Sequence, residues 1–321
     1  MTIAITMGDP SGIGPEIILK AHKNKRITGS YFVIGDYEIL EYCNTKLRYG
    51  VKLKRINSIE EINNNYLNIY NLDLLKKQEI EVGKATKKGG YASYKYIEFA
   101  TKLALERKIE AFVTLPINKE AVRMSFNNYS GHTEQIAEMC KEKNTCMMLI
   151  SEKLIVTHVT THVSLVDAIK QITEERVYNV VKLTNEALNK FKKNPKIAVA
   201  GLNPHAGENC LFGYEERDKI KPAIQKAKME NIHVCGPISP DIVFLKAYNK
   251  KYDAVVCMYH DQGHIPMKLL DFERCANVTL GLKIIRVSVD HGTAYDIAYK
   301  GISSIESFCF AYEFAVKLIS S

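Results

Sequence analysis

The sequence predicts an α/β fold in two lobes, built on a mixed, mostly parallel sheet. Short apolar, β-branched segments alternate with longer amphipathic segments along the chain, which is typical of strands joined by helices. Several short segments are apolar at nearly every position, as in strands buried on both faces. The length of 321 residues exceeds what one hydrophobic core usually organises, so we expect two lobes.

The apolar segments place seven strands in chain order. They are residues 3–6 (IAIT), 31–34 (YFVI), 111–115 (AFVTL), 154–159 (LIVTHV), 196–201 (KIAVAG), 254–258 (AVVCM) and 284–289 (IIRVSV). Helical patterns cover residues 16–23, 90–107, 132–141, 173–192, 214–230 and 305–319. Within residues 174–191 the apolar positions recur every three or four residues, as on an amphipathic helix. The polar segment 42–88, rich in Asn and Lys, is interpreted as peripheral strands and loops of the first lobe.

Composition excludes several classes of protein. With 46% hydrophobic and 25% charged residues, the chain is neither disordered nor fibrous. The net charge of +8 comes from scattered lysines without interleaved aromatic residues, so we expect no nucleic-acid partner. The eight cysteines form no CxxC pair, and no apolar run approaches the roughly 18 residues of a membrane helix. Because the N-terminal segment also lacks a basic region, we expect no signal peptide and a cytoplasmic location.

Histidines follow four of the predicted strands, in residues 157–162, 203–207, 260–263 and 290–293. In open α/β sheets, ligands bind at the carboxyl ends of strands, so these histidines point to one cleft. Neutral imidazoles suit a divalent transition metal, and His162, His205 and His260 are the candidate ligands. Such an ion polarises an alcohol or carbonyl oxygen. The H-E-x-x-H motif of metalloproteases is absent.

Two further segments suit ligands. The loop GDPSGIGPEI fails the dinucleotide fingerprint because Ile17 stands where Gly or Ala is needed, and it fails the P-loop pattern. It still forms a glycine-rich turn that permits close approach to the backbone. The predicted helix at His132 and Thr133 begins with backbone N–H groups that suit a phosphate or carboxylate. Lys268 and Arg286 are candidate anion clamps.

Together these motifs resemble the 4-hydroxythreonine-4-phosphate dehydrogenase (PdxA) family of vitamin B6 biosynthesis. The segments are GDPSGIGPEI, LPINK, GHTEQIA, TTHVSLVDA, GLNPHAGE, GPISPDIVF, MYHDQGHIPMK and NVTLGLKIIRVSVDHGTAYDIAYKGI. The combination of NPHAGE, YHDQG and VDHGTA is specific, and the resemblance spans residues 3 to about 305. It implies a fold similar to isocitrate and isopropylmalate dehydrogenases. The lobes are then residues 1–125 plus 266–321 for the cofactor, and 126–265 for metal, substrate and dimerisation.

The resemblance also implies the reaction. NAD or NADP oxidises 4-phosphohydroxy-L-threonine to 2-amino-3-oxo-4-phosphohydroxybutanoate, which decarboxylates to 3-amino-2-oxopropyl phosphate. One divalent ion is expected: three imidazoles suit zinc, cobalt or nickel, whereas a nearby carboxylate admits magnesium or manganese. A homodimer is expected, with site residues possible from both subunits. The resemblance adds Asn277 to the substrate contacts. The expected substrate contacts are then His132, Thr133, Lys268, Asn277 and Arg286.

The remaining roles follow from the same comparison. His162, His205 and His260 match the family's metal ligands. The cofactor contacts are expected at Gly12, His291, Gly292, Thr293, Ala294 and Asp296. Asp241 and Lys268 are both candidates for the general base.

The sequence departs from the family pattern at a few positions. His264 replaces an apolar or small residue and is interpreted as a partly exposed loop residue. Tyr295 and Tyr299 stand where the distant dehydrogenases carry Pro and Gly, so the choice between NAD and NADP does not transfer.

Three alternatives stay open. A paralogue could oxidise another hydroxy acid, such as a four-carbon sugar-acid phosphate, or a diol. A metal-dependent phosphatase or hydrolase would use the histidines without a dinucleotide, but has no reason to carry the DHGTAYDIA loop. A non-catalytic binding protein would not need three histidines of metal-ligand type at strand ends.

Overall fold

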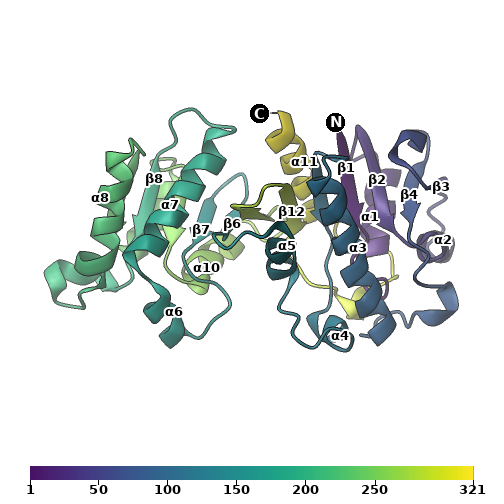
Figure 1. The fold of residues 1–321 in the computed structure, drawn as a ribbon, viewed down its shortest axis with the longest axis horizontal. Helices are drawn as coiled ribbons and strands as arrows, with labels where there is room; N and C mark the ends of the chain where they lie inside the picture. Colours follow the sequence, from purple (N-terminus) through teal and green to yellow (C-terminus); the bar gives the residue numbers. More distant parts are fainter. Residues whose placement is uncertain (321) are drawn as a thin grey trace. The chain divides into compact units, whose positions relative to one another are not determined.

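Residues 1–320, which the computed structural model describes, form two units with six strands in each (Figure 1). The first unit comprises Met1–Lys143 and Leu282–Ser320, and the second comprises Asn144–Gly281. The twelve strands of these residues are mostly parallel, so the α/β class with a mixed sheet is confirmed.

The first unit has a fully parallel sheet of strand order β3-β4-β2-β1-β5-β12. Its strands are β1 (Thr2–Thr6), β2 (Ser30–Gly35), β3 (Leu53–Ile56), β4 (Leu67–Asn71), β5 (Ala111–Thr114) and β12 (Ile285–Val289). Ile3, Ala4 and Ile5 of the central β1 are buried, as a strand covered on both faces requires.

Six helices surround this sheet within the described part of the first unit. They are α1 (Gly14–Lys23), α2 (Tyr37–Lys46), α3 (Lys87–Leu105), α4 (Lys119–Arg123), α5 (His132–Cys140) and α11 (Glu306–Ser320). The Thr86 hydroxyl accepts a hydrogen bond from the Gly89 N–H and caps α3, which packs along β1 and β2 (Figure 1). Helix α11 packs on β5 and β12.

The second unit has a mixed sheet of strand order β11-β6-β7-β10-β8-β9. Its strands are β6 (Cys146–Ile150), β7 (Ile155–His158), β8 (Ile197–Ala200), β9 (Val234–Ile238), β10 (Ala254–Cys257) and β11 (Ala276–Leu280). Strand β6 runs antiparallel to both β11 and β7, whereas β7, β10, β8 and β9 are parallel. The carboxyl ends of β7 and β10 therefore lie side by side, with Cys257 level with His158.

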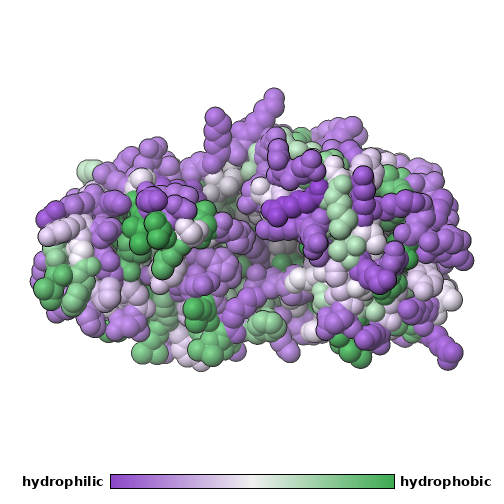
Figure 2. Space-filling view, turned by 90° about the horizontal axis from the view of Figure 1, so that it is seen from below, coloured by the Kyte–Doolittle hydropathy of each residue, from purple (hydrophilic) through white to green (hydrophobic). Residues whose placement is uncertain are grey.

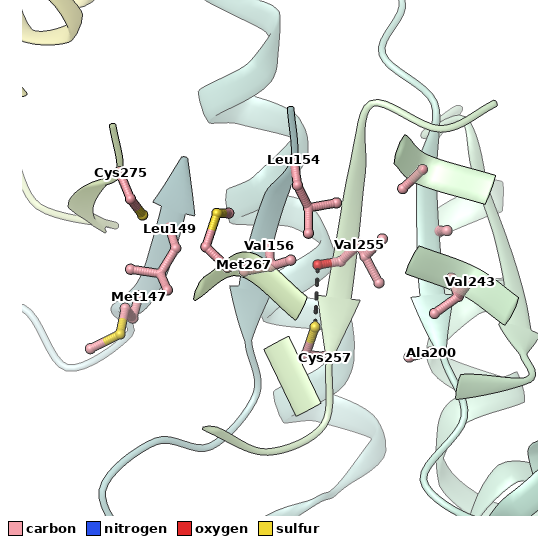
Figure 3. Packing of buried hydrophobic residues seen from close by; sticks show 12 residues of the cluster. Met147, Leu149, Leu154, Val156, Ala200, Val243, Val255, Cys257, Met267 and Cys275 are labelled. Carbon is pink, nitrogen blue, oxygen red and sulfur yellow. Dashed lines mark hydrogen bonds between the residues drawn. The ribbon is translucent and has the colours of Figure 1, made fainter. Parts of the chain in front are cut away.

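Five α-helices belong to the described part of the second unit. They are α6 (Leu165–Gln171), α7 (Glu174–Asn189), α8 (Lys221–Met229), α9 (Pro240–Tyr248) and α10 (His260–Leu270). Figure 3 shows the core beneath α10 and α9, where Met267 packs near Val156 and Leu149 and Val243 packs near Ala200. The Cys257 thiol in this core is close to the Val255 carbonyl oxygen, and burial raises its pKa, so it remains a neutral thiol.

All seven predicted strands are present, with ends that differ by at most one residue. The segment 42–88 contributes β3, β4 and short turns to the first unit, as predicted. Helix α10 replaces the loop predicted around His264, although its interior contains Pro266.

The unit boundaries lie later in the chain than the lobe limits at residues 125 and 265. Helix α5 belongs to the first unit, where the Gln135 amide donates to the Tyr94 carbonyl of α3. Strand β11 belongs to the second unit because it pairs with β6. No helix among residues 1–320 combines the length and the apolar character that a membrane-crossing segment needs.

Candidate active site

The second unit gathers histidines at the adjacent carboxyl ends of β7 and β10. His158 is the last residue of β7, His162 lies in the loop that follows it, and His260 begins α10. The ring centres of His162 and His260 lie 5.4 Å apart, and those of His158 and His260 lie 6.3 Å apart. His264 was not among the predicted ligands, yet its ring stacks on that of His260 at 3.6 Å.

Hydrogen bonds orient three of these imidazole rings. The Nδ1 atom of His260 lies 2.6 Å from a carboxylate oxygen of Asp261, and Nδ1 of His264 lies 3.0 Å from the His260 carbonyl oxygen. His158 places Nδ1 3.4 Å from the Met147 carbonyl oxygen. Since these oxygens only accept, Nδ1 is the donor in each ring, and the neutral tautomer has its lone pair on Nε2.

His158 is the fully buried member of this group of histidines. Burial lowers its pKa to about 3, with smaller contributions from His264 and His260. A Cβ atom on Gly263 would lie 2.5 Å from the His158 Nε2 atom, so only glycine allows α10 to approach this closely. His158 therefore stays neutral and holds the start of α10 in place.

A surface pocket of about 420 Å³ opens beside these rings within the second unit. The loop after β7, helix α6 and the start of α10 line it, with the residues Thr161, His162, Val163, Ser164, Leu165, Ala168, Tyr259, His260 and Asp261. Two predicted metal ligands, His162 and His260, thus face one small pocket.

The third predicted ligand, His205, lies in a separate loop. This exposed residue follows β8 in a segment where His205 to Asn209 have left-handed backbone conformations. The buried Glu216 carboxylate anchors the loop by accepting hydrogen bonds from the Leu202 and Asn203 N–H groups. Among residues 1–320, no three His, Cys, Asp or Glu side chains converge closely enough to hold an ion. The donor chemistry of His162 and His260 fits a divalent metal, and the three-histidine set stays a prediction.

The second unit also holds the predicted general bases. Asp241 is exposed at the start of α9, and a hydrogen bond from the Ser239 hydroxyl lowers its pKa, with a smaller contribution from His205. Lys268 lies on α10, with its ammonium 5.0 Å from the centre of the Phe272 ring.

Asn277 lies on β11, and its Oδ1 atom is buried without a hydrogen-bond partner. A buried amide oxygen of this kind is suited to a ligand donor.

The first unit contains a buried cationic site. Arg286 of β12 is 2% exposed, and its Nε and Nη2 atoms donate to the Thr114 hydroxyl of β5 at 3.1 and 2.7 Å. Burial lowers the pKa of Arg286 to about 10, which leaves it positively charged at neutral pH.

His132 lies next to this guanidinium at the start of α5. Its Nε2 atom is shielded from solvent and has no hydrogen-bond partner. Burial lowers the pKa of His132 well below 6.5, and the cations of Arg286 and Lys119 lower it further. The Lys119 ammonium lies near the start of α5, since its Nζ atom is 3.4 Å from where a Cβ atom on Gly131 would lie. Two cations, a neutral imidazole and the first turn of α5 with Thr133 thus lie together, and the Glu134 carboxylate lies beside them, with Oε2 2.9 Å from a Cβ atom placed on Gly131. The group still has a net positive charge, which suits an anion.

The predicted cofactor residues lie in two loops of the first unit that contact each other. The Ile13 N–H donates to the Thr293 carbonyl at 3.0 Å, and a Cβ atom on Gly12 would lie 2.9 Å from the same oxygen. His291, Gly292, Ala294 and Asp296 continue this loop after β12, so it lies against the glycine-rich loop around Gly12.

Tyr295 and Tyr299, which differ from the residues of the distant dehydrogenases, connect these two loops by hydrogen bonds. The Tyr295 hydroxyl donates to the buried Asp9 carboxylate at 2.6 Å, and the Tyr299 hydroxyl donates to the Pro10 carbonyl at 2.8 Å. The buried Glu16 carboxylate accepts from the Ser303 N–H at 2.8 Å. Burial raises the pKa of Asp9, while the Tyr295 and Ser11 hydrogen bonds act in the opposite direction.

Comparisons with known proteins find relatives that match nearly the whole chain. The profile of the family described as pyridoxal phosphate biosynthetic protein PdxA matches residues 28–315. A protein of Oceanobacillus iheyensis, provisionally named D-threonate 4-phosphate dehydrogenase, is 46% identical over 98% of this chain and 97% of its own length. The 4-hydroxythreonine-4-phosphate dehydrogenase of Geobacter metallireducens is 43% identical over 95% of this chain and 91% of its own.

Solved structures give the same result for the fold. The crystal structure of 4-hydroxythreonine-4-phosphate dehydrogenase from Klebsiella pneumoniae has a TM-score of 0.91 and 38% identity, and covers 100% of this chain and 98% of that one. A β-decarboxylating dehydrogenase from Thermococcus kodakarensis matches with a TM-score of 0.52 at 14% identity, covering 99% of this chain and 83% of that one. The predicted relation to the isocitrate dehydrogenase fold is therefore confirmed.

Proposed function

Because this chain belongs to the PdxA family of dehydrogenases, we propose that it oxidises a phosphorylated four-carbon 3-hydroxy acid with NAD or NADP and a divalent metal. The observation that carries the proposal is the cationic site of Arg286, Lys119 and His132, where an anionic group of a substrate would meet a buried guanidinium. A phosphate or carboxylate bound there would accept charge-assisted hydrogen bonds from a guanidinium that is shielded from bulk water, where such bonds are stronger.

We assign the remaining roles on the same basis. His162, His205 and His260 would hold the metal, and the loops of Gly12 and residues 291–296 would hold the dinucleotide. When bound, the metal would polarise the substrate hydroxyl, and the dinucleotide would accept the hydride from the same carbon. Lys268, Asn277 and Thr133 remain proposed substrate contacts, and Asp241 and Lys268 remain the two candidates for the base that takes the hydroxyl proton.

The chemistry then continues without a further co-reactant. Loss of hydride and proton converts the 3-hydroxyl into a 3-keto group, which lies β to the carboxylate. The C1–C2 bond breaks, its electron pair passes to the ketone oxygen as an enolate, and carbon dioxide leaves. Protonation at C2 completes the product, a three-carbon keto phosphate.

We favour D-threonate 4-phosphate as the substrate over 4-phosphohydroxy-L-threonine, which the sequence comparison implied. The two differ at C2, where the first has a neutral hydroxyl group and the second an ammonium group. D-threonate 4-phosphate therefore has one more net negative charge and lacks the ammonium group that the two cations of this site would repel. The 46% identical relative with that name supports the same choice.

A direct comparison of the two acids tests this proposal. Purified protein with Zn²⁺, Co²⁺ or Mg²⁺ and either NAD or NADP would be followed by the absorbance of the reduced nicotinamide. We expect reduction with a higher kcat/KM for D-threonate 4-phosphate. A higher kcat/KM for 4-phosphohydroxy-L-threonine would reverse the substrate assignment, and no reduction with either acid would refute the dehydrogenase proposal.

We also propose that the protein is a homodimer. Apolar side chains are exposed on the second unit (Figure 2), including Ile265, Leu269 and Phe272 at and just beyond the end of α10. A spacing of four residues places Ile265 and Leu269 on one side of α10, and Phe272 follows the end of the helix. An apolar patch of this kind is typical of a surface that a second copy covers.

A further inference from the structure

A second pocket lies in the first unit, apart from the predicted cofactor contacts. It has a volume of about 600 Å³ and opens beside the last turn of α1, where the chain enters β2, β3 and β4. Since these strands are parallel, their amino ends lie at one edge of the sheet. The loop of Gly12 and residues 291–296 follow β1 and β12, so they lie at the opposite edge. A ligand of this pocket would therefore not displace a dinucleotide bound at those loops.

The lining of this pocket is basic. Lys23, Lys25 and Lys52 contribute three ammonium groups, and none of the lining residues, all of them within the described part of the chain, is Asp or Glu. The Glu306 carboxylate is engaged by Arg26, whose guanidinium donates to it at 2.7 and 3.1 Å. The helix dipole favours basic residues at the end of α1, which accounts for Lys23 and Lys25, but Lys52 lies in a different segment just before β3. Two separate segments thus bring positive charge to one pocket.

Hydrogen bonds fix the segment before β3 in place. The Asn44 side chain of α2 donates to the Val51 carbonyl at 2.8 Å and accepts from the Val51 N–H at 3.1 Å. The Lys52 carbonyl accepts from the Leu67 N–H at the start of β4, also at 2.8 Å. The volume lies within the range of about 300–1,000 Å³ that is typical of small-molecule sites. A preformed pocket of this size loses little conformational entropy when a ligand binds.

Aromatic side chains form the less polar part of the lining. The Tyr49 ring belongs to it, and its centre lies 5.2 Å from the Lys23 Nζ atom. The Tyr31 hydroxyl, on the first turn of chain in β2, lies 2.7 Å from the Nδ1 atom of His22. The pocket therefore places aromatic rings beside its ammonium groups.

We propose that this basic pocket binds the diphosphate group of a small molecule. An ammonium group offers a full positive charge and three N–H donors, which suits phosphate oxygens. A diphosphate has negative charge on two phosphorus centres, so it can contact Lys52 and the lysines of α1 together. Nucleotides and free polyphosphates share this chemistry, and a nucleotide base would also contact the tyrosine rings. The site lies outside the proposed active site and does not depend on the proposed reaction.

Limited acetylation of lysines, followed by peptide mass spectrometry, tests the proposal with pyrophosphate as the probe. Lys25 is an exposed residue of the pocket, so we expect pyrophosphate to protect it from acetylation. The double variant Lys23→Gln/Lys52→Gln should raise the pyrophosphate concentration that half-protects Lys25 about 10-fold or more, because two charge-assisted contacts are lost. Lys221→Gln/Lys228→Gln removes the same charge from exposed positions of α8 and should keep the wild-type value.

ADP in place of pyrophosphate distinguishes the two sources of a diphosphate. Protection of Lys25 at a lower concentration of ADP than of pyrophosphate would support a nucleotide, and a similar or higher concentration would support a free polyphosphate. No protection of Lys25 by either probe would overturn the proposal, as would equal half-protecting concentrations in the wild type and Lys23→Gln/Lys52→Gln. Because Lys25 reports on this pocket alone, probe bound at Arg286 does not alter the readout, and a negative result leaves the proposed function untouched.

Discussion

Arg286 shows at the scale of one residue how a strand can serve a binding site. Arg286 stands among the apolar, β-branched residues of β12. Its guanidinium is buried and donates a hydrogen bond to the Thr114 hydroxyl. The guanidinium stays charged at neutral pH, so an anionic group that reached it would gain a charge-assisted hydrogen bond.

We expect Arg286→Met to raise the KM of the phosphorylated acid about 10- to 100-fold, since a hydrogen bond to a charged group contributes about 1.5–3 kcal/mol. The KM of NAD(P) should change less, because neither Arg286 nor its partner Thr114 is among the predicted cofactor contacts. Steady-state kinetics with each substrate varied would measure both. Arg217→Met, which removes an exposed guanidinium, is the control and should leave both values unchanged. Equal losses for acid and cofactor would contradict the role of Arg286.

His132 makes the stability of the protein depend on pH. Its pKa in the folded protein lies well below the 6.5 of an unfolded chain, so the unfolded state binds a proton that the folded state does not. The stabilisation is present above pH 6.5 and is lost as the pH falls.

His132→Gln should therefore flatten the fall in the free energy of unfolding as the pH drops below 6.5, by up to about 1.4 kcal/mol per pH unit for one proton. Urea unfolding of wild type and variant at several pH values would measure this difference. Parallel curves for the two proteins would show that His132 titrates normally in the folded state.

Arg286 and His132 were predictable from the sequence, whereas their neighbours were not, for a physical reason. Thr114 and Lys119 belong to a strand and to the start of a short helix, and only the pairing of β5 with β12 brings them to Arg286. The LPINK motif contained Lys119, but nothing in its spacing distinguishes it from a surface lysine. His264 was similarly set aside because HDQGHIP, with Gly263 and Pro266, is typical of a loop.

At the scale of elements, the paired loops of the first unit depend on the Tyr295–Asp9 hydrogen bond. Tyr295→Phe would leave the buried Asp9 carboxyl with the Ser11 N–H as its remaining bond among those described here. We expect a loss of about 1–3 kcal/mol.

Thermal unfolding measures this loss, which corresponds to a Tm lower by about 2–4 °C for each kcal/mol. The KM of NAD(P) should rise too, because the loop of Thr293 loses its anchor. Tyr66→Phe alters a partly exposed tyrosine of the same unit and should change neither value. A Tyr295→Phe protein with wild-type Tm and cofactor KM would exclude the anchoring role.

Strands were predictable where burial on both faces makes every position apolar, as in β5 and β10. Strand β3 was not predictable, because its sequence LKRI lies at a sheet edge and only Ile56 is buried. The antiparallel direction of β6 and β11 was also not predictable, since strand direction depends on long-range pairing rather than on local pattern.

At the scale of the whole molecule, the exposed apolar side chains of α10 predict assembly. Leu269→Glu places a charge at a position that is 84% exposed in the single chain, and it should convert the dimer to a monomer in sedimentation equilibrium. Met229→Glu, at a similarly exposed position of α8, is the control and should leave the dimer intact. A wild-type monomer, or a dimer that Leu269→Glu leaves unchanged, would contradict this assignment.

Two units could be predicted from chain length, but their boundaries could not. The chain leaves the first unit at residue 143, in a polar run, and returns at residue 282, in an apolar run next to Gly281, and neither position is a linker rich in Gly, Ser or Pro. Only the packing of α5 on α3 and the pairing of β11 with β6 determine these positions.

The central claim is that this protein couples oxidation of a phosphorylated hydroxy acid to loss of carbon dioxide. The most direct test is to measure NAD(P)H, carbon dioxide and inorganic phosphate together, with D-threonate 4-phosphate and a divalent metal. The account predicts equal amounts of NAD(P)H and carbon dioxide and no release of phosphate. Release of phosphate without NAD(P)H would instead indicate a metal-dependent phosphatase and would contradict the account.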